Sequence, residues 1–532
     1  MTTIDREAGA RDARVQMPTL RQIFWGALAS GVRRIARWRR DGMLGKRALE
    51  RRRRSLRFEA LEPRLLLSAD LTYSAVESGD LTLRASDLDG VGILELVDSA
   101  DPGIVLASQA IANIDGSSGY GARIDASDFD ITLRIDASAE AAGIAGGIVF
   151  VGGGGANTLA GANLENTWTL AGSGSGGVGS VSFSGVETLV GGAGADTLVG
   201  ADADATWTLT GSDSGSVGGI SFGGIENLSG GTGQDLFAFA EGAGLSGAID
   251  GGGGANTLDY SARTTGVTWN RASGTASGTG GVANIQAIVG GAGADTLVGA
   301  DTDATWTLSG PNSGSVGGVS FSGIENLSGG TGADTLVGTD ADATWTLSGS
   351  NSGGVGGVSF SGIENLSGGA GADTLVGADA DATWTLSGSN SGSVAGVSFS
   401  GIENLSGGAG ADTLVGTDAD ATWTLSGPNS GSVGGINFSG VENLSGGAGA
   451  DTVVGTDTDT TWALSGANSG SVAGMGFSGV EYLSAGVGAD TIVGTDADTS
   501  WTVSGPNSGS VGGINFSGVE NLSGGAGADA VA

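Results

Sequence analysis

The stretch Gly191–Val199 combines residue types that suit a divalent cation. Six turn residues, rich in glycine, end in Asp196 and lead directly into the β-type triplet Thr197–Val199. Glycine adopts positive φ and allows close backbone approach, so the carbonyl groups of such a turn can point inward. Carboxylate and carbonyl oxygens are the ligands that Ca²⁺ prefers. The pattern therefore predicts calcium sites at glycine-rich turns that are followed by strands.

This stretch recurs along the chain. It returns complete from Gly290, Gly368 and Gly407, and with small changes from Gly230, Gly329, Gly446, Ala485 and Gly524. Tryptophans at 306, 345, 384, 423, 462 and 501 follow one another at steps of 39 residues, and phenylalanines and glutamates keep the same step. A fixed period of this size is typical of solenoids. We expect an all-β, right-handed parallel β-solenoid (β-roll or β-helix) whose Trp and Phe side chains stack in internal ladders.

One unit, read from Gly329, shows four expected strands. These are Thr335–Val337, Thr344–Ser348, Val358–Ser361 and Ile363–Ser367, where apolar residues alternate with Thr and Ser as in strands buried on one face. A second turn, Gly338–Ala343, is a degenerate copy of the motif with alanine at the aspartate position. Its acids Asp340 and Asp342 either cap strands or bind ions peripherally.

The number of coils per unit controls the calcium chemistry. Four strands can form two coils or one large coil, and the tandem nine-residue motifs favour two. Equivalent turns of successive units would then lie about 9.6 Å apart, because neighbouring coils are spaced by about 4.8 Å. One ion cannot bridge that distance. The turn Ser350–Gly353, which is poor in carboxylates, would have to complete each site. Calcium sites would therefore be fewer and weaker than in a roll with the motif in every coil.

The run Ile363–Gly377 resembles the RTX (haemolysin-type) calcium-binding repeats, and the likeness extends over about Gly152–Ala532. The resemblance implies Ca²⁺ as the cofactor and the sixth-position aspartates as ligands: Asp196, Asp235, Asp295, Asp334, Asp373, Asp412, Asp451, Asp490 and Asp529. It also implies ligand carbonyls at Gly191, Gly192, Gly194, Gly330, Gly332, Gly369, Gly371, Gly408 and Gly410. Asn157 and Asn256 replace the aspartate in two copies, which predicts weaker sites there.

The composition excludes most enzyme classes. The chain of 532 residues has no cysteine and no histidine, so disulfides, thiolate sites, Ser-His-Asp triads and histidine-ligated zinc are absent. The net charge is −35, and no Lys or Arg follows Arg271. A polyanion of this kind does not bind nucleic acid but attracts calcium. A uniform array also offers no singular cleft, so we expect no catalytic residues and no enzyme activity.

The first 68 residues form a basic leader that holds 17 of the 22 Lys and Arg residues. Its apolar run Ile23–Val32 is shorter than the about 20 residues that a membrane span needs, so no transmembrane span is expected. We expect the leader to be partly helical or disordered. Near its end, the residues resemble the LEPR-XLL sorting motif of large bacterial repeat proteins, which implies a role ahead of an exported array; the matching residues are Leu61, Glu62, Pro63, Arg64, Leu66 and Leu67.

The predicted organisation has five parts. These are the leader at 1–68, a β-rich entry cap at 69–151, solenoid units at 152–229, a divergent unit or insertion at 230–290, and units at 291–532 whose array continues beyond the chain's end. In the entry cap, strands are expected at Leu81–Arg84, Gly92–Val97, Ile131–Ile135 and Ile148–Val151.

These features predict a secreted or cell-surface calcium-binding structural protein of a bacterium. It would be adhesin-like, with calcium ions and a ligand on a host or abiotic surface as its partners. Two alternatives remain at this point. The chain could be a fragment of a larger toxin or hydrolase, or its solenoid could be independent of calcium.

Overall fold

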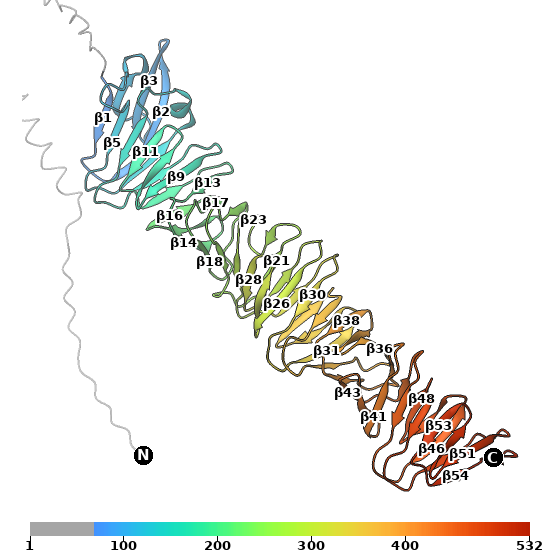
Figure 1. The fold of residues 1–532 in the computed structure, drawn as a ribbon. Coiled ribbons are helices and arrows are strands. Elements are labelled where there is room, and N and C mark those ends of the chain that lie inside the picture. Colours follow the sequence, from blue (N-terminus) through green and yellow to red (C-terminus); the bar gives the residue numbers. More distant parts are fainter. Residues whose placement is uncertain (1–68) are drawn as a thin grey trace, which may run out of the picture. The chain divides into compact units, whose positions relative to one another are not determined.

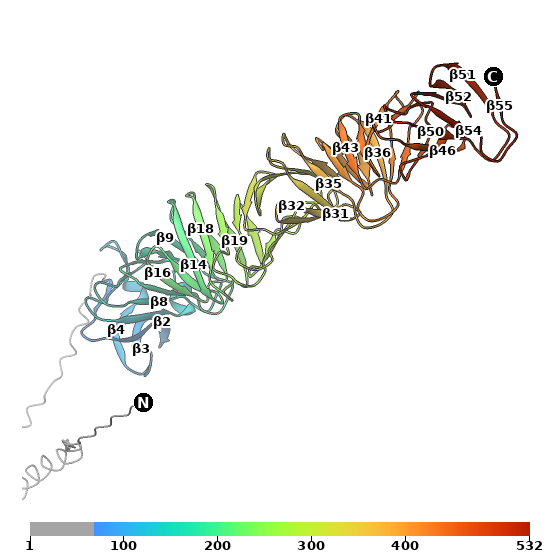
Figure 2. The same cartoon turned by 90° about the horizontal axis from the view of Figure 1, so that it is seen from below.

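The computed structural model describes residues 69–532, which form a nearly all-β solenoid, as the sequence predicts (Figure 1). The basic leader and the LEPR-like motif lie outside the described residues. Short strands follow one another in chain order from β1 to β55 (Figures 1 and 2). The helical elements of this part are the 3₁₀ turn η1 (Ile111–Asn113) and the five-residue α2 (Ala137–Ala141).

The entry coils contain the predicted strands. Their bounds are β1 (Leu71–Ser74), β2 (Gly79–Leu88), β3 (Val91–Asp98), β4 (Val105–Ala110), β5 (Ala122–Asp125), β6 (Ile131–Ile135) and β7 (Ile148–Val151). The strands β2, β3 and β4 form an antiparallel meander, whereas β2 pairs with β6 in parallel. Alternate residues of β6 point inward, since Ile131, Leu133 and Ile135 are buried.

Each 39-residue unit contains five strands and not the four that the sequence suggests. In the unit from Gly329 they are β30 (Thr335–Val337), β31 (Thr344–Gly349), β32 (Ser352–Val355), β33 (Val358–Ser361) and β34 (Asn365–Ser367). The additional strand β32 overlaps the turn expected above at Ser350–Gly353 and extends to Val355. It pairs antiparallel with β31 and β33, so each unit carries a three-stranded meander within an otherwise parallel ladder.

Two tight turns make this meander possible. The first is Ser350–Asn351, where Asn351 has φ 53°, and the second is Gly356–Gly357, with φ 59° and 88°. The consecutive positive φ values of the second turn are the mark of the two-residue hairpin turns that match strand twist. The first turn has one positive φ and follows a β-bulge between Leu347 and Gly349. Side chains of Trp345 and Leu347 in β31 point inward and the intervening threonine outward, as predicted.

The chain crosses between two sheets three times in each unit, so a unit makes one and a half coils. The unit above places β30 and β34 in one sheet and its meander in the other. The next unit places its meander β36 (Thr383–Gly388), β37 (Ser391–Val394) and β38 (Val397–Ser400) next to β34. Successive units therefore alternate between faces. The prediction of two coils per unit is wrong, because it overlooked the middle strand of the meander.

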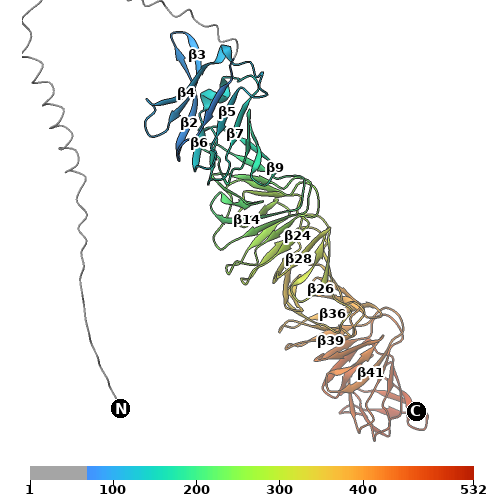
Figure 3. The same ribbon diagram turned by 90° about the vertical axis from the view of Figure 1, so that its left-hand side faces the viewer.

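One face of the solenoid is a continuous ladder, and the other consists of two sheets. The continuous ladder runs from β4 to β54 (Asn521–Ser523) and includes β24 (Ala287–Val289), β28 (Val319–Ser322) and β26 (Thr305–Gly310), which lie close together in Figure 3. Opposite it, one sheet ends at β23 (Gly281–Ala283) and the other begins at β21 (Thr268–Asn270). Residues 230–290 thus interrupt one face and leave the other intact.

The core holds aromatic pairs and not the continuous ladders expected above. Each unit's tryptophan meets its own phenylalanine edge to face, as in Trp345 and Phe360, whose ring centroids lie 6.4 Å apart at 63°. Because successive units alternate faces, the next tryptophan, Trp384, lies in the opposite sheet. A cross-coil stack forms between Trp207 and Phe237, at 5.6 Å and 18°.

Candidate metal site

Three turns lie side by side at each edge of the solenoid. In one example they are the second turn Gly338–Ala343, the motif turn Gly368–Asp373 and the glutamate turn Gly401–Glu403. They are adjacent because the strands that they enter, β31, β35 (Thr374–Val376) and β39 (Asn404–Ser406), pair in parallel at steps of 30 residues. The expectation that Ser350–Gly353 directly adjoins the motif turn is wrong, because the glutamate turn lies between them. Glu364 Oε1 accepts from Asn351 Nδ2 at 2.7 Å, and Glu364 Oε2 accepts from Asp334 N–H at 2.9 Å.

Side chains join these turns by a ladder of hydrogen bonds. The backbone N–H of Ala343 donates to Asp373 Oδ1 at 2.9 Å, and Ala372 N–H donates to Asp342 Oδ1 at 2.9 Å. Asp373 N–H donates to Glu403 Oε2 at 2.9 Å. The carboxylates therefore satisfy backbone donors that the turns would otherwise leave unpaired. For Asp342 this geometry supports the strand-capping interpretation of the second turn.

The first position of the motif turn is tightly packed, and it is glycine in all the copies named above except one, where Ala485 stands. A Cβ atom on Gly368 would lie 2.0 Å from the carbonyl oxygen of Gly401 and 2.5 Å from Asp373 Oδ2. Both distances are far below contact, and the first neighbour is backbone. The turn therefore brings a carboxylate oxygen and a carbonyl oxygen to the same spot.

We expect Gly368→Ala to destabilise the array by about 1–3 kcal/mol, because overpacking at a fixed backbone forces the neighbouring turn to shift. Urea unfolding followed by circular dichroism measures the loss. Gly223→Ala serves as the control, since nothing lies within 4 Å of that Cβ position. Equal stability of the two variants would contradict the expectation.

The sixth-position aspartates are buried and keep one oxygen without a partner. Asp373 is fully buried; its Oδ1 accepts the bond from Ala343, and its Oδ2 has no hydrogen-bond partner. The same unpartnered Oδ2 occurs at Asp196, Asp334, Asp412, Asp451 and Asp490. Asp235 has two unpartnered oxygens, Asp295 Oδ2 accepts from Gly291 N–H at 2.6 Å, and Asp529 is half-buried. An ionised buried oxygen without a partner is costly.

The two asparagine copies show what surrounds that oxygen. Asn157 Nδ2 donates to the carbonyl oxygens of Gly152 at 2.9 Å and Gly155 at 3.0 Å, the first and fourth positions of its own motif. Asn256 Nδ2 donates to Gly253 O at 2.9 Å. The position of the amide nitrogen is therefore lined by acceptors. An aspartate in its place has a carboxylate oxygen that faces carbonyl oxygens, and these oxygens repel one another. A cation bound between them would remove this repulsion.

A second amide marks a denser cluster of oxygens between the second turn and the motif turn. Asn166 Nδ2 lies 2.9 Å from Ala162 O, 2.8 Å from Leu164 O, 3.2 Å from Gly191 O and 2.7 Å from Asp196 Oδ1. Later second turns have alanine or threonine at this position. Where it is threonine, as at Thr460, the hydroxyl donates to Thr458 O at 2.7 Å. Where it is alanine, no side-chain donor reaches these acceptors.

Burial governs the protonation of the aspartates. Removal from water raises the pKa of Asp373, and the charges of Glu403 and Asp342 raise it further. Burial likewise raises the pKa of Asp235, Asp295, Asp334, Asp412, Asp451 and Asp490. Nearby positive charge would counteract this effect. The indole N–H of Trp345 also lowers the pKa of Asp373, although no hydrogen bond of normal length joins them.

Most oxygens at these turns come from the backbone. Within residues 69–532 no three acidic side chains converge in a way that could hold a metal ion. A cation at the motif turn would therefore take carbonyl oxygens and one carboxylate. The predicted carbonyls at the first and fourth motif positions, such as Gly191 and Gly194, correspond to the oxygens that the Asn157 amide contacts.

Sequence reasoning missed two partners of the motif turn. The second turn was read as a degenerate motif in a separate coil, and Glu403 was noted only for its spacing. The signal for both was present, because Glu403 lies 30 residues after Asp373 and Ala343 lies 30 residues before it. The interpretation failed because it did not include β32 as a strand. The residues of β32, Ser-Gly-Gly-Val, have weak β-propensity.

Comparison with known protein families agrees with the geometry. The model of the RTX calcium-binding nonapeptide repeat matches residues 182–204, 285–303, 320–342, 359–381, 398–420, 437–469 and 475–498. These segments contain most of the motif and second turns described above. No curated protein matches the chain. The chain thus carries RTX calcium-binding nonapeptide repeats, arranged as a β-solenoid that uses Ca²⁺ as its cofactor.

Proposed function

We propose that this chain is a secreted or cell-surface structural protein whose solenoid is stiffened by Ca²⁺ outside the cell and presents an adhesin-like surface. The repeats make calcium ions its partners. The proposal assigns it no catalysis and no nucleic-acid binding. No helix within residues 69–532 has the length and hydropathy to cross a lipid bilayer. The RTX calcium-binding repeats support the proposal of a structural protein that binds calcium. The secreted or surface location and the adhesin-like role go beyond the repeats and are part of the proposal.

The observation that carries the calcium role is the row of buried, unpartnered Asp Oδ2 atoms. The asparagine copies place carbonyl oxygens where that atom points, so the donor set is made of hard oxygens, as Ca²⁺ requires. The aspartates would hold the ion together with the first and fourth carbonyls of their own turn. In the copy with Asn166, the carbonyl oxygens of the second turn and Asp196 Oδ1 surround one amide nitrogen. A cation at the corresponding place in the alanine copies would take these carbonyls as further ligands.

Calcium binding would also join adjacent turns. A ligand that binds only the folded state adds RT ln(1 + [L]/Kd) per site to the free energy of unfolding. An array of equivalent sites sums these contributions along neighbouring coils. Folding therefore depends on the calcium concentration, which favours a loose chain before export and a stiff one afterwards. Bound cations would further reduce repulsion within a chain of net charge −35.

The test is thermal unfolding in calcium and in EDTA. We expect a large increase in melting temperature at millimolar Ca²⁺, and a smaller increase for Asp373→Asn with Asp412→Asn. These changes keep the side-chain shape and supply the donor that natural Asn157 uses. Asp89→Asn, at an exposed hairpin outside the array, is the matched control.

Each outcome of this test has a clear meaning. Identical melting temperatures in EDTA and in excess Ca²⁺ would favour a calcium-independent solenoid and reject the proposal. Calcium stabilisation that Asp373→Asn and Asp412→Asn leave unchanged would place the ions elsewhere. The second alternative, a fragment of a larger toxin or hydrolase, predicts a catalytic module in the flanking coding sequence, whereas further repeats there would support the surface role.

A further inference from the structure

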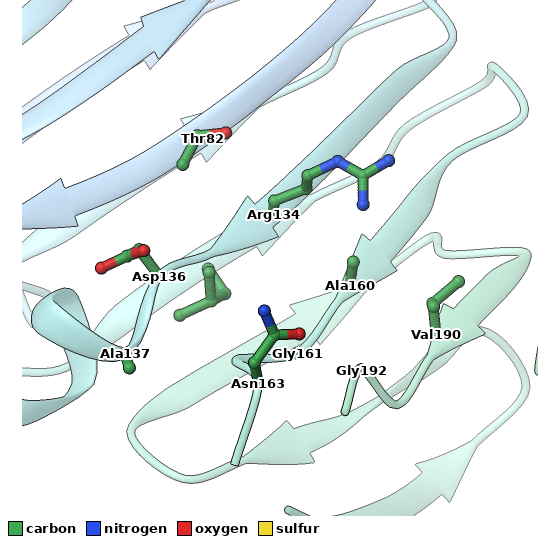
Figure 4. A pocket seen from close by; sticks show the side chains of 10 residues that line it. Thr82, Arg134, Asp136, Ala137, Ala160, Gly161, Asn163, Val190 and Gly192 are labelled. Atoms are coloured by element: carbon green, nitrogen blue, oxygen red, sulfur yellow. The ribbon is translucent and has the colours of Figure 1, made fainter. Parts of the chain in front are cut away.

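A hollow on the outer surface of the entry coils has a lining unlike that of the hollows in the regular units, which lie between hairpin strands and second turns. It has a volume of about 290 Å³ and lies across β2, β6, β8 (Thr158–Ala160) and β12 (Thr188–Val190). Thr82, Arg134 and Ala160 occupy one row on adjacent strands, in register with Val190. Figure 4 shows Arg134, Asp136 and Asn163 around the same space.

The lining of this hollow departs from the repeat. The third residue of the strand after the motif turn is valine at Val298 and in the following units, but it is Ala160 here. Ala160 is 4 % exposed and forms the floor. The smaller side chain leaves room between Arg134 and Val190. The segment Asp136–Ala137, at the start of α2, forms another wall.

Arg134 has no partner among the described residues. Of the other arginines there, Arg84 pairs with Glu95 and Arg123 with Asp125. Arg263 donates to Ala243 O, and Arg271 to Val316 O and Gly317 O. A guanidinium offers a planar set of donors that fits a carboxylate with two parallel hydrogen bonds. Arg134 therefore presents an unused carboxylate-binding group at the hollow.

The charge around Arg134 is also altered. Asn163 stands at the third position of its second turn, where the later units outside the divergent part 230–290 have aspartate: Asp202, Asp301, Asp340, Asp379, Asp418, Asp457 and Asp496. The exchange of an acid for an amide removes a negative charge that would repel a bound anion next to Arg134, and it adds a hydrogen-bond donor. Asp136 also lines the hollow, and Ser138 donates to its Oδ1, so its other oxygen can accept from a hydroxyl group.

We propose that this hollow binds a hydroxylated monocarboxylate of monosaccharide size, the chemistry of a uronic acid residue in an anionic glycan. Arg134 takes the carboxylate, and Asn163 and Asp136 take hydroxyl groups. A single cation with Asp136 nearby disfavours a dianionic phosphate and a nucleic-acid backbone. This inference adds a ligand class to the proposed adhesive role. It rests on the proposed function only for its biological meaning, because sugar binding itself can be measured independently.

The test is calorimetric titration of the full chain, in calcium buffer, with methyl glucuronide and with the uncharged methyl glucoside. We expect glucuronide binding to exceed glucoside binding by at least tenfold. Arg134→Gln should weaken glucuronide binding at least tenfold, and Ala160→Val should do the same by filling the hollow with the residue that other units carry. Arg123→Gln, on a strand of the other sheet, should leave binding unchanged.

Three results would overturn the proposal: no glucuronide binding, equal binding of both sugars, or full binding by Arg134→Gln. Circular dichroism of each variant shows that it is folded, and Arg134 is exposed, so its replacement leaves the core intact. Because the calcium role is judged by melting temperature and this site by sugar binding, failure of one is distinguishable from failure of the other.

Discussion

In EDTA, the melting temperature of this protein is expected to rise as the pH is lowered from about 7.5 towards the usual aspartate pKa of about 3.9. Burial raises the pKa of seven aspartates in the folded array above the usual value of about 3.9. The folded state therefore binds more protons than the unfolded chain in this range. The stabilisation that comes from this proton uptake is complete below the ordinary aspartate pKa. It is lost as the pH rises through the raised pKa values of the folded state.

Bound calcium should reverse the dependence of the melting temperature on pH. Binding needs the ionised carboxylate, so protons compete with the ion, and calcium stabilisation is lost as the pH falls. The melting temperatures with and without calcium should therefore lie far apart at about pH 7.5 and approach each other as the pH falls towards about 3.9. Differential scanning calorimetry across this range measures both. The effect is large because it sums over the seven aspartates.

A variant separates the aspartates from the general charge of the chain. Replacement of Asp334, Asp373, Asp412 and Asp451 by asparagine should flatten the pH dependence in EDTA, while an equal number of substitutions at the exposed acids Asp340, Asp379, Asp418 and Asp457 should not. A melting temperature in EDTA that increases with pH, or equal slopes in the two variants, would show that buried carboxylates do not control stability.

The solenoid and its inward-facing residues could be predicted from the sequence because both depend on local patterns. Alternation in Thr344–Ser348 and the entry strand Ile131–Ile135 follows from the two-residue period of a strand. A glycine-rich turn that ends in an acid likewise depends on a few adjacent residues. The aspartates were therefore located without knowledge of how the coils stack.

The stacking could not be predicted, because it depends on β32. Ser352–Val355 contains two glycines and little apolar surface, so no local propensity indicates a strand. Once β31 and β33 flank it, the backbone pairs on both sides and gives each unit an odd number of crossings. That parity decides which turn lies beside Asp373. An error in one weak strand thus changed the predicted neighbours of every site.

Trp345→Ala is expected to cost about 3–5 kcal/mol of stability, the usual range for deleting a fully buried large aromatic side chain. Trp345 is fully buried, contacts Phe360 edge to face, and reaches beneath the second turn, where its Cζ2 lies 2.8 Å from the Cβ position of Gly338. Its loss would remove packing in one coil and support for the adjacent turn. Urea unfolding measures the change, with the half-exposed Tyr482→Ala as the control.

The same substitution should also divide the array. In a solenoid each coil contacts only its neighbours, so a lesion in the middle weakens the coupling between the two sides. We therefore expect unfolding of Trp345→Ala to become broader or biphasic, whereas Trp345→Phe should retain most of the packing and lose only the indole N–H beside Asp373. If the alanine variant unfolded in one sharp transition with a loss below about 1 kcal/mol, the tryptophan would not be the element that couples neighbouring coils, and the coupling would have to come from the turns.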